Sequence, residues 1–136
     1  MDTAAVPIPT RLFRAMRKDE SGRPRLGSQG SMLGARPGVD IHLDAASLVQ
    51  GGTGGMSVTP DNPLRLPVHV RPLRLGGIGK LPVFELHAAR LGERLAYRAD
   101  PKAPDRHGFI EPSQPMSFDS YQAAIAQTQS SWTEMP

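Results

Sequence analysis

The sequence predicts an α+β domain made of short strands, long loops and one C-terminal helix. Glycine and proline interrupt the chain every few residues, with 14 of each among 136 residues, and both favour turns and confine strands to brief runs. Apolar side chains between them recur at period two, as in strands, and only near the C-terminus at the spacing of a helix. The length is that of one domain. We therefore expect a flexible N-terminus over residues 1–10 and a single domain over residues 11–136.

The first predicted strand covers Arg11 to Met16. Phe13 and Arg14 fall on opposite faces of it at period two, although so short a run is also compatible with a helix. Arg14 either points to solvent, which the spacing favours, or turns into a cleft as a forked donor to phosphate or ribose. Residues 18–38 are polar, rich in glycine and punctuated by proline, which predicts a long functional loop, with disorder as the alternative.

Further short runs predict strands, most of them beside a glycine or a proline. The clearest is Val39 to Leu43, where apolar and polar side chains alternate. The others are Met56 to Thr59, Val68 to Arg71, Val83 to His87 and Leu95 to Arg98. Asp44 to Gln50 is expected to add a helical turn. Gly76 to Lys80 lacks the spacing of a phosphate-binding loop and is interpreted as a turn.

The predicted helix extends from about Phe118 to Trp132, with Ser117 as its N-cap. Its apolar side chains, Tyr121 and Ile125 among them, recur every three or four residues and form a stripe that must pack on the sheet. Trp132 is the only tryptophan. We expect it to anchor the core rather than to stack on a ligand.

The net charge of +3 is unevenly distributed, because no lysine or arginine occurs from His107 onward. The positive charge gathers in two clusters. They are Arg11, Arg14, Arg17, Lys18, Arg23, Arg25 and Arg36, and Arg65, Arg71, Arg74 and Lys80. Such clusters attract phosphate groups, although a solvated basic face has the same composition.

Composition and spacing argue against several other classes of site. The chain has no cysteine, and its histidines are far apart without a spacing such as H-E-x-x-H, so we expect neither a disulfide nor a metal. No apolar run approaches the roughly 20 residues of a membrane span, and residues 1–10 lack a classical signal peptide. We expect a protein that is cytoplasmic in the cell that makes it and has no membrane partner.

Thr53 to Val58, with the sequence TGGMSV, is the segment best suited to a nucleotide. Gly54 and Gly55 allow the backbone to approach a pyrophosphate or a nicotinamide amide closely, and Thr53 and Ser57 add hydroxyl groups. The alternative is a hairpin in which the glycines only supply positive φ.

Four motifs follow one another along the chain. They are Leu12-Phe13-Arg14-Ala15, Thr53-Gly54-Gly55-Met56-Ser57-Val58, His107-x-x-Ile110-x-Pro112-x-x-Pro115-Met116 and the terminal helix that ends near Trp132. Their order and spacing resemble the ADP-ribosyltransferase-fold toxins of the type VI secretion system, specifically the cytoplasm-acting member and its relatives. The resemblance spans about residue 11 to residue 132. It implies a compact split β-sheet, an ADP-ribosyltransferase-like fold, with a cleft for NAD.

The resemblance also implies roles for individual residues. The first-strand arginine of the family falls on Arg14, where it resembles a clamp for the dinucleotide phosphates. Thr53 and Ser57 then shape the pocket for the nicotinamide ribose. Met56 departs from the pattern, because it occupies one place of the hydroxyl pair found in the relatives.

A transferase of this type commonly needs a late glutamate, which stabilises an oxocarbenium-like ribose and orients the acceptor. Glu111 is the candidate by position, with Glu85, or no acid at all, as the alternative. Glu111 has a second interpretation as an exposed acid before a proline. His107 is expected either to hydrogen-bond a ribose hydroxyl or to close a turn before Gly108.

The resemblance therefore predicts an antibacterial toxin that takes NAD as substrate, is delivered to the cytosol of a recipient cell and transfers ADP-ribose to a macromolecular target. Its implied partner is a cognate immunity protein, and the basic upstream surface predicts that the partner's contacting face is acidic. The alternatives are a noncatalytic module that binds a partner or nucleic acid, and an NAD glycohydrolase that uses water as acceptor. One tryptophan, two tyrosines and four phenylalanines make a poor stacking platform, so nucleic acid is disfavoured.

Overall fold

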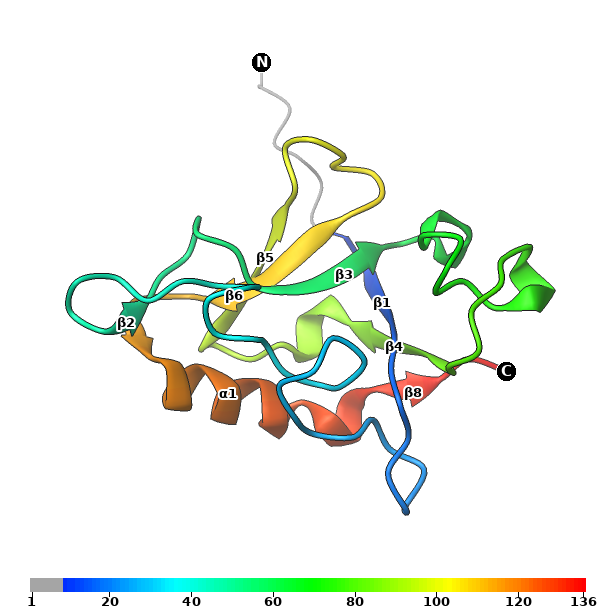
Figure 1. Cartoon of the computed structure of the whole chain (residues 1–136), viewed down its shortest axis with the longest axis horizontal. Helices are drawn as coiled ribbons and strands as arrows, with labels where there is room; N and C mark the ends of the chain where they lie inside the picture. Colours follow the sequence, from blue (N-terminus) through cyan, green and yellow to red (C-terminus); the bar gives the residue numbers. More distant parts are fainter. Residues whose placement is uncertain (1–8) are drawn as a thin grey trace.

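The computed structural model describes residues 9–136, so the predicted flexible N-terminus lies outside the described residues except for Pro9 and Thr10. Within them the chain forms an α+β domain with an antiparallel sheet and one C-terminal α-helix (Figure 1). This confirms the predicted class of α+β domain. The larger sheet has the strand order β5-β6-β3-β1-β4-β8, and β2 and β7 form a small second sheet.

The elements have the following bounds. The strands are β1 Arg11–Ala15, β2 Leu48–Val49, β3 Met56–Pro60, β4 Val83–His87, β5 Leu95–Ala99, β6 Gly108–Pro112, β7 Met116–Ser117 and β8 Thr133–Glu134. The α-helix is α1 Phe118–Gln127, and the 3₁₀ turns are η1 Pro63–Arg65, η2 Leu73–Leu75, η3 Ala88–Arg90 and η4 Gln129–Ser131. None of the helices in residues 9–136 is both long and apolar enough to cross a membrane.

The larger sheet parts between β1 and β3. β1 pairs with β4 along its whole length, but with β3 only where Leu12 lies opposite Pro60 and Phe13 opposite Thr59. Past Phe13 the two strands diverge, while β3 stays paired with β6 through Ser57 and its two neighbours. The sheet is therefore two halves, β5-β6-β3 and β1-β4-β8, joined at one end.

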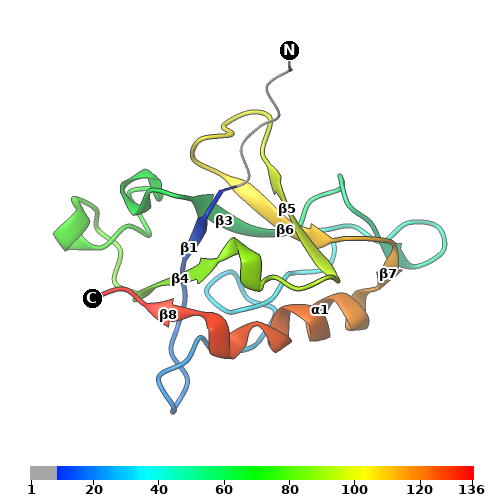
Figure 2. The ribbon, with the colours of Figure 1, turned by 180° about the vertical axis from the view of Figure 1, so that it is seen from behind.

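Helix α1 lies along one side of the larger sheet, as Figures 1 and 2 show. The Oγ of Ser117 caps it by accepting a hydrogen bond from the Ser120 N–H at 3.1 Å. Tyr121 and Ile125 are buried in the main core, as the predicted stripe requires. The chain leaves the α-helical form after Gln127, so the predicted helix is right for its first 10 residues and then tightens into η4.

Trp132 follows η4 and is only 4% exposed. Its indole Nε1 donates a hydrogen bond to Thr128 Oγ1 at 2.9 Å, and its ring belongs to the core cluster beneath the sheet. The prediction that Trp132 anchors the core is confirmed.

The predicted strands at Arg11 to Met16, Met56 to Thr59, Val83 to His87 and Leu95 to Arg98 are confirmed as β1, β3, β4 and β5. Residues 18–38 contain no helix or regular strand, only isolated bridges, in agreement with the predicted loop. Gly76 has a left-handed φ of 86° at the end of η2, which confirms the turn that begins there.

Two predicted strands are wrong. In Val39 to Leu43 only Ile41 is buried, because the N–H groups of Val39 and Asp40 both bond to the carbonyl of Arg36 and close a tight turn. Val68 to Arg71 also turns, since two of its N–H groups donate to the carbonyl of Pro67. In both segments a local turn uses the backbone groups that a neighbouring strand would need.

The predicted helical turn at Asp44 to Gln50 is also wrong. The side chain of Asp44 accepts hydrogen bonds from the N–H groups of Ala46 and Leu48. An aspartate that bonds the backbone ahead of it offers the chain an alternative to a helix. The chain then enters β2 instead.

Candidate functional site

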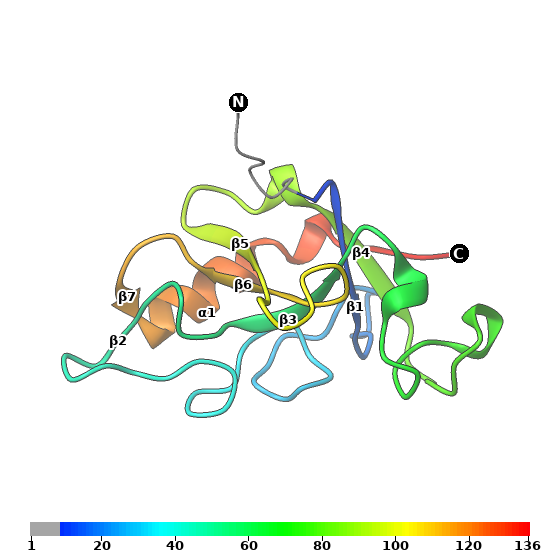
Figure 3. The ribbon, with the colours of Figure 1, turned by 90° about the horizontal axis from the view of Figure 1, so that it is seen from above.

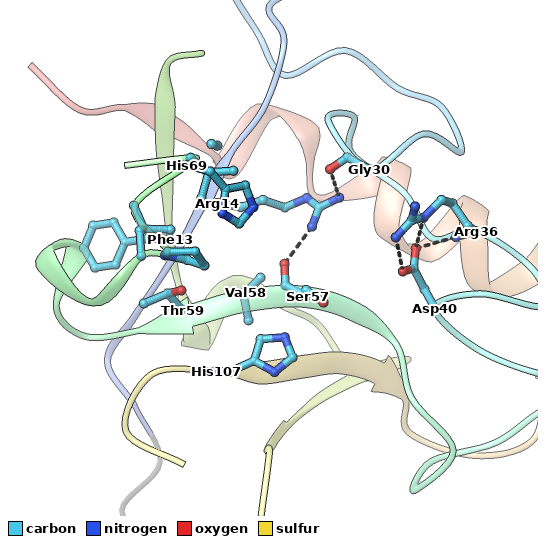
Figure 4. Close-up of a pocket in the computed structure, with 14 residues that line it drawn as sticks. Phe13, Arg14, Gly30, Arg36, Asp40, Ser57, Val58, Thr59, His69 and His107 are labelled. Carbon is cyan, nitrogen blue, oxygen red and sulfur yellow. Dashed lines mark hydrogen bonds and ion pairs between the residues drawn. The ribbon is translucent and has the colours of Figure 1, made fainter. Parts of the chain in front are cut away.

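A pocket of about 270 Å³ opens where β1 and β3 diverge (Figure 4). We call it the split pocket. Its walls come from β1, β3, the 66–70 segment, Gly30 with Arg36 and Asp40, and His107 immediately before β6. Arg14, Ser57 and His107, which come from three distant parts of the chain, all line it. The structure thus brings three of the predicted site residues together.

Arg14 is the most constrained side chain of the pocket. It is 8% exposed, so the solvent-facing interpretation is wrong. Its Nη1 donates to Ser57 O at 2.7 Å, its Nη2 to Gly30 O at 2.9 Å, and Nη2 and Nε both donate to Met32 O, at 2.9 and 3.3 Å. Figure 4 shows the guanidinium between β3 and the loop that carries Gly30.

Burial lowers the pKa of Arg14 to about 10, and the nearby Asp40 carboxylate partly offsets this effect. A guanidinium with that pKa is still protonated at neutral pH. Arg14 therefore carries a positive charge inside the domain, and its N–H groups donate hydrogen bonds to main-chain oxygens. Through them it ties residues 30–32, part of the predicted functional loop, to the split edge of β3.

Arg36 and Asp40 form the second polar pair of the split pocket. The Nε of Arg36 lies 3.1 Å from Asp40 Oδ2 and its Nη2 lies 2.9 Å from Oδ1. Hydrogen bonding to this carboxylate raises the pKa of Arg36 above its ordinary value. Asp40 was not among the predicted site residues. Its spacing of four residues from Arg36 is a signal that could have found the pair.

Ser57 and His107 offer polar groups to a ligand in the split pocket. Ser57 uses its carbonyl to hold Arg14, and among residues 9–136 no hydrogen bond occupies its hydroxyl group. His107 Nδ1 lies 2.8 Å from Asp100 Oδ2, and the ring packs edge-on against Phe109 at 4.8 Å. The bond with His107 holds the pKa of Asp100 below its usual value. With Nδ1 engaged, Nε2 is the ring nitrogen left for a ligand.

The glycine pair lies outside the split pocket. A Cβ on Gly54 would lie 2.1 Å from Asp40 O, and one on Gly55 would lie 2.5 Å from Ile110 O. The close approach that the glycines allow is therefore between chain segments, not to a ligand. Both glycines do supply positive φ, 121° at Gly54 and 153° at Gly55, as the alternative predicted. The segment is not a hairpin between β2 and β3, because β3 pairs with β1 and β6. Thr53 bonds locally to Gln50 O at 2.7 Å.

Glu111 lies on β6 but does not line the split pocket. Its Oε1 accepts from Arg98 Nε at 2.7 Å and from the Gly52 N–H at 2.9 Å. Glu85, the alternative acid, pairs with Arg11 at 3.0 Å and also lies outside the pocket. Asp40 is the carboxylate that the structure places in the pocket wall, within the described residues.

A second and larger hollow, of about 650 Å³, adjoins the split pocket. We call it the arginine groove, because Arg65, Arg71 and Arg106 line it together with Asp105. The two hollows share Thr59, Leu66, Pro67 and His107 as a common wall. A ligand too long for the split pocket can therefore extend over that wall into the groove.

Residues 9–136 contain no cluster of three or more histidine, aspartate or glutamate side chains that could hold a metal ion. In comparisons with known proteins, no family model matches the chain and no curated protein matches it significantly.

Proposed function

We propose that this chain is an antibacterial toxin with an ADP-ribosyltransferase-like fold, which binds NAD at the split between β1 and β3. The observation that carries the proposal is the meeting of Arg14, Ser57 and His107 in one pocket, because these residues belong to three of the motifs on which the resemblance rests. The parting of the sheet beside that pocket supports it as well.

The size of the two hollows also supports a dinucleotide. Ligand pockets usually enclose about 300 to 1,000 Å³, and the split pocket by itself, at about 270 Å³, is slightly smaller than that range. Half of the dinucleotide, the nicotinamide ribose, fits that space. The hydroxyl of Ser57 and the free nitrogen of His107 are then the groups that bond the ribose hydroxyls.

In the proposed reaction the bond between ribose C1′ and the nicotinamide nitrogen breaks, and its electron pair leaves with nicotinamide. A nucleophilic atom of the target molecule bonds to C1′ and gives up its proton. Positive charge develops on the ribose before the new bond forms, so a nearby carboxylate stabilises the transition state. Glu111 supplies it only if its bonds to Arg98 and Gly52 open. Asp40 already lines the pocket and is the second candidate.

The engagement of Glu111 outside the pocket favours one alternative, a noncatalytic binding module with the same fold. An NAD glycohydrolase, in which water replaces the target molecule, uses the same pocket. The three functions differ in their products: a labelled macromolecule, free ADP-ribose, or neither.

The test is induced expression in bacterial cytosol of the wild type, of Ser57→Ala and of the control Ser130→Ala, which changes an exposed serine of η4. Growth, the NAD pool and transfer of labelled ADP-ribose to macromolecules are measured. We expect growth arrest and labelling with the wild type and the control, and neither with Ser57→Ala. Loss of NAD without labelling identifies the glycohydrolase. Normal growth with soluble wild-type protein and an unchanged NAD pool refutes the enzyme.

A cognate immunity protein is part of the proposal, and the segment 61–82 is where we propose it binds. This segment extends beyond the sheet at the opposite end from β2 and β7 (Figure 3). Leu73 is 82% and Ile78 is 70% exposed, beside the exposed Arg74 and Lys80. Exposed apolar side chains among cations fit a partner with an apolar centre and an acidic rim. Leu73→Asp should leave the toxin active but prevent rescue of growth by the immunity protein.

A further inference from the structure

The position of the phosphates in the proposed complex depends on which arginines are free to bind them. Five arginines line the split pocket and the arginine groove. They are Arg14, Arg36, Arg65, Arg71 and Arg106. A phosphate needs a guanidinium whose N–H groups are accessible and whose charge is not already neutralised.

Arg14 does not meet this requirement, although the resemblance assigns the phosphates to it. Its four hydrogen bonds to main-chain oxygens leave at most one of the five N–H groups of a guanidinium. Turning it toward a phosphate would remove the donor from three main-chain carbonyls, those of Ser57, Gly30 and Met32. Arg14 is therefore a positioning residue that holds the pocket walls.

Two more arginines already have carboxylate partners. Arg36 is bonded through two nitrogens to Asp40. Arg65 lies 2.5 Å from an Asp105 oxygen. Each pair is close to neutral as a unit, so neither adds much attraction for an anion.

Arg71 and Arg106 remain. Neither has a carboxylate partner within residues 9–136, and both line the groove. Arg71 donates from Nη1 to Leu64 O, while its Nε is buried and finds no acceptor in the same residues. A buried N–H without an acceptor is unusual in a folded protein. The donor of Arg71 that a phosphate can reach is its Nη2, which is not buried and makes no hydrogen bond within residues 9–136. The backbone at Arg71 is also fixed, because its carbonyl accepts from the Gly79 N–H at 2.7 Å.

We infer that the arginine groove binds the diphosphate of the nucleotide through Arg71 and Arg106. The inference rests on the proposed function for the identity of the ligand. With the nicotinamide ribose in the split pocket, the rest of the nucleotide passes over the common wall at Thr59 and His107 into the groove. There the two guanidinium groups bond the phosphate oxygens as forked, permanently charged donors.

The experiment measures binding of ADP, which carries the diphosphate and lacks nicotinamide, by isothermal titration calorimetry. The variants are Arg71→Gln with Arg106→Gln, and the control Arg74→Gln, which removes an exposed cation of the same segment outside the groove. Loss of charged hydrogen bonds to a phosphate should weaken binding at least about tenfold in the double variant. The control should bind like the wild type. Urea unfolding followed by Trp132 fluorescence confirms that all three proteins are folded.

Equal affinity of the double variant and the wild type overturns the inference, as does the absence of ADP binding by the wild type. Binding of single-stranded oligonucleotides in preference to ADP overturns it as well, because the groove then serves a nucleic acid. Different results separate failure of the proposed function from failure of the groove. ADP binding that depends on Arg71 and Arg106, without consumption of NAD, refutes the enzyme and keeps the groove. NAD turnover with an unchanged KM in the double variant refutes the groove and keeps the enzyme.

Discussion

Replacement of Arg14 by methionine tests whether this arginine holds the split sheet together. Methionine fills the space of the aliphatic stem but has no N–H group. The carbonyls of Ser57, Gly30 and Met32 then lose the donor that all three share. Loop 30–32 loses its main attachment to β3.

The size of the effect follows from two opposing terms. Hydrogen bonds from a charged donor stabilise a fold by at least about 1.5 kcal/mol each, so the four bonds of Arg14 contribute about 6 kcal/mol. Burying the cation opposes them. Burial lowers its pKa to about 10, and this lowering corresponds to roughly 3 kcal/mol. We expect Arg14→Met to lower the free energy of unfolding by about 3 kcal/mol, a large part of the usual 5 to 15 kcal/mol.

Urea unfolding measures this loss, with the fluorescence of Trp132 as the signal, since the only tryptophan of the chain is buried. Arg23→Met is the control, because Arg23 is exposed and its side chain makes no hydrogen bond within residues 9–136. The control should change the free energy of unfolding by less than about 0.5 kcal/mol. A loss below about 1 kcal/mol for Arg14→Met, with an unchanged denaturant slope, would show that water replaces the guanidinium at little cost.

Three further substitutions test other parts of the fold by the same unfolding measurement. Gly54→Ala should lower the free energy of unfolding by more than about 3 kcal/mol, because its Cβ would lie 2.1 Å from a main-chain oxygen. The control Gly52→Ala has open space around it and should lower the free energy of unfolding by about 1 kcal/mol. Equal losses in the two variants would contradict this. Tyr121→Phe should lower the free energy of unfolding by about 1 to 3 kcal/mol, since the Tyr121 hydroxyl bonds a buried N–H and a buried carbonyl. An unchanged free energy of unfolding would refute this. The bond from His107 lowers the pKa of Asp100, so the stability it contributes is present above about pH 4 and is lost on further acidification. Asp100→Asn should therefore make the free energy of unfolding less dependent on pH below about pH 4, and parallel pH profiles of the two proteins would refute this.

Strands were predicted correctly from the sequence where an alternating pattern of apolar side chains coincides with partner strands in the folded sheet. Met56 to Thr59 and Val83 to His87 become strands because partners lie on both sides of each. Val39 to Leu43 has an equally regular alternation, yet its backbone is consumed by the turn at Arg36. Alternation reports which residues suit a strand, and it contains no information about the partner strand.

The interior strand β6 was not predicted as a strand, although its residues were part of a recognised motif. It begins at Gly108 and ends at Pro112, both of which usually weaken the signal for a strand. In the structure Gly108 leaves room for the ring of Tyr97 on β5, since a Cβ there would lie 2.2 Å from the Tyr97 hydroxyl and displace that side chain. Proline is tolerated at the last position, where the ladder ends.

The candidate site was predictable only in part. Arg14, Ser57 and His107 were singled out from motifs, and they do meet in one pocket. Asp40 and Arg106 lie in irregular segments, and tertiary contacts alone bring them to the two hollows. The glycine pair shows the opposite case: its need for space was foreseen correctly, but the neighbour is a main-chain oxygen of the same chain.

The split between β1 and β3 explains why Arg14 cannot be used to test the proposed chemistry on its own. Where two strands part, carbonyl groups lose the ladder bonds of a regular sheet and need other donors. One buried guanidinium serves Ser57 and two loop carbonyls at once, which the compact ammonium group of a lysine cannot do as well. Loss of activity after substitution of Arg14 therefore follows equally from a lost ligand contact and from a collapsed pocket. Within residues 9–136 the Arg71 side chain bonds only Leu64 O and the Arg106 side chain makes no hydrogen bond. Neither holds β1 and β3 together, so their substitution separates ligand binding from collapse of the split.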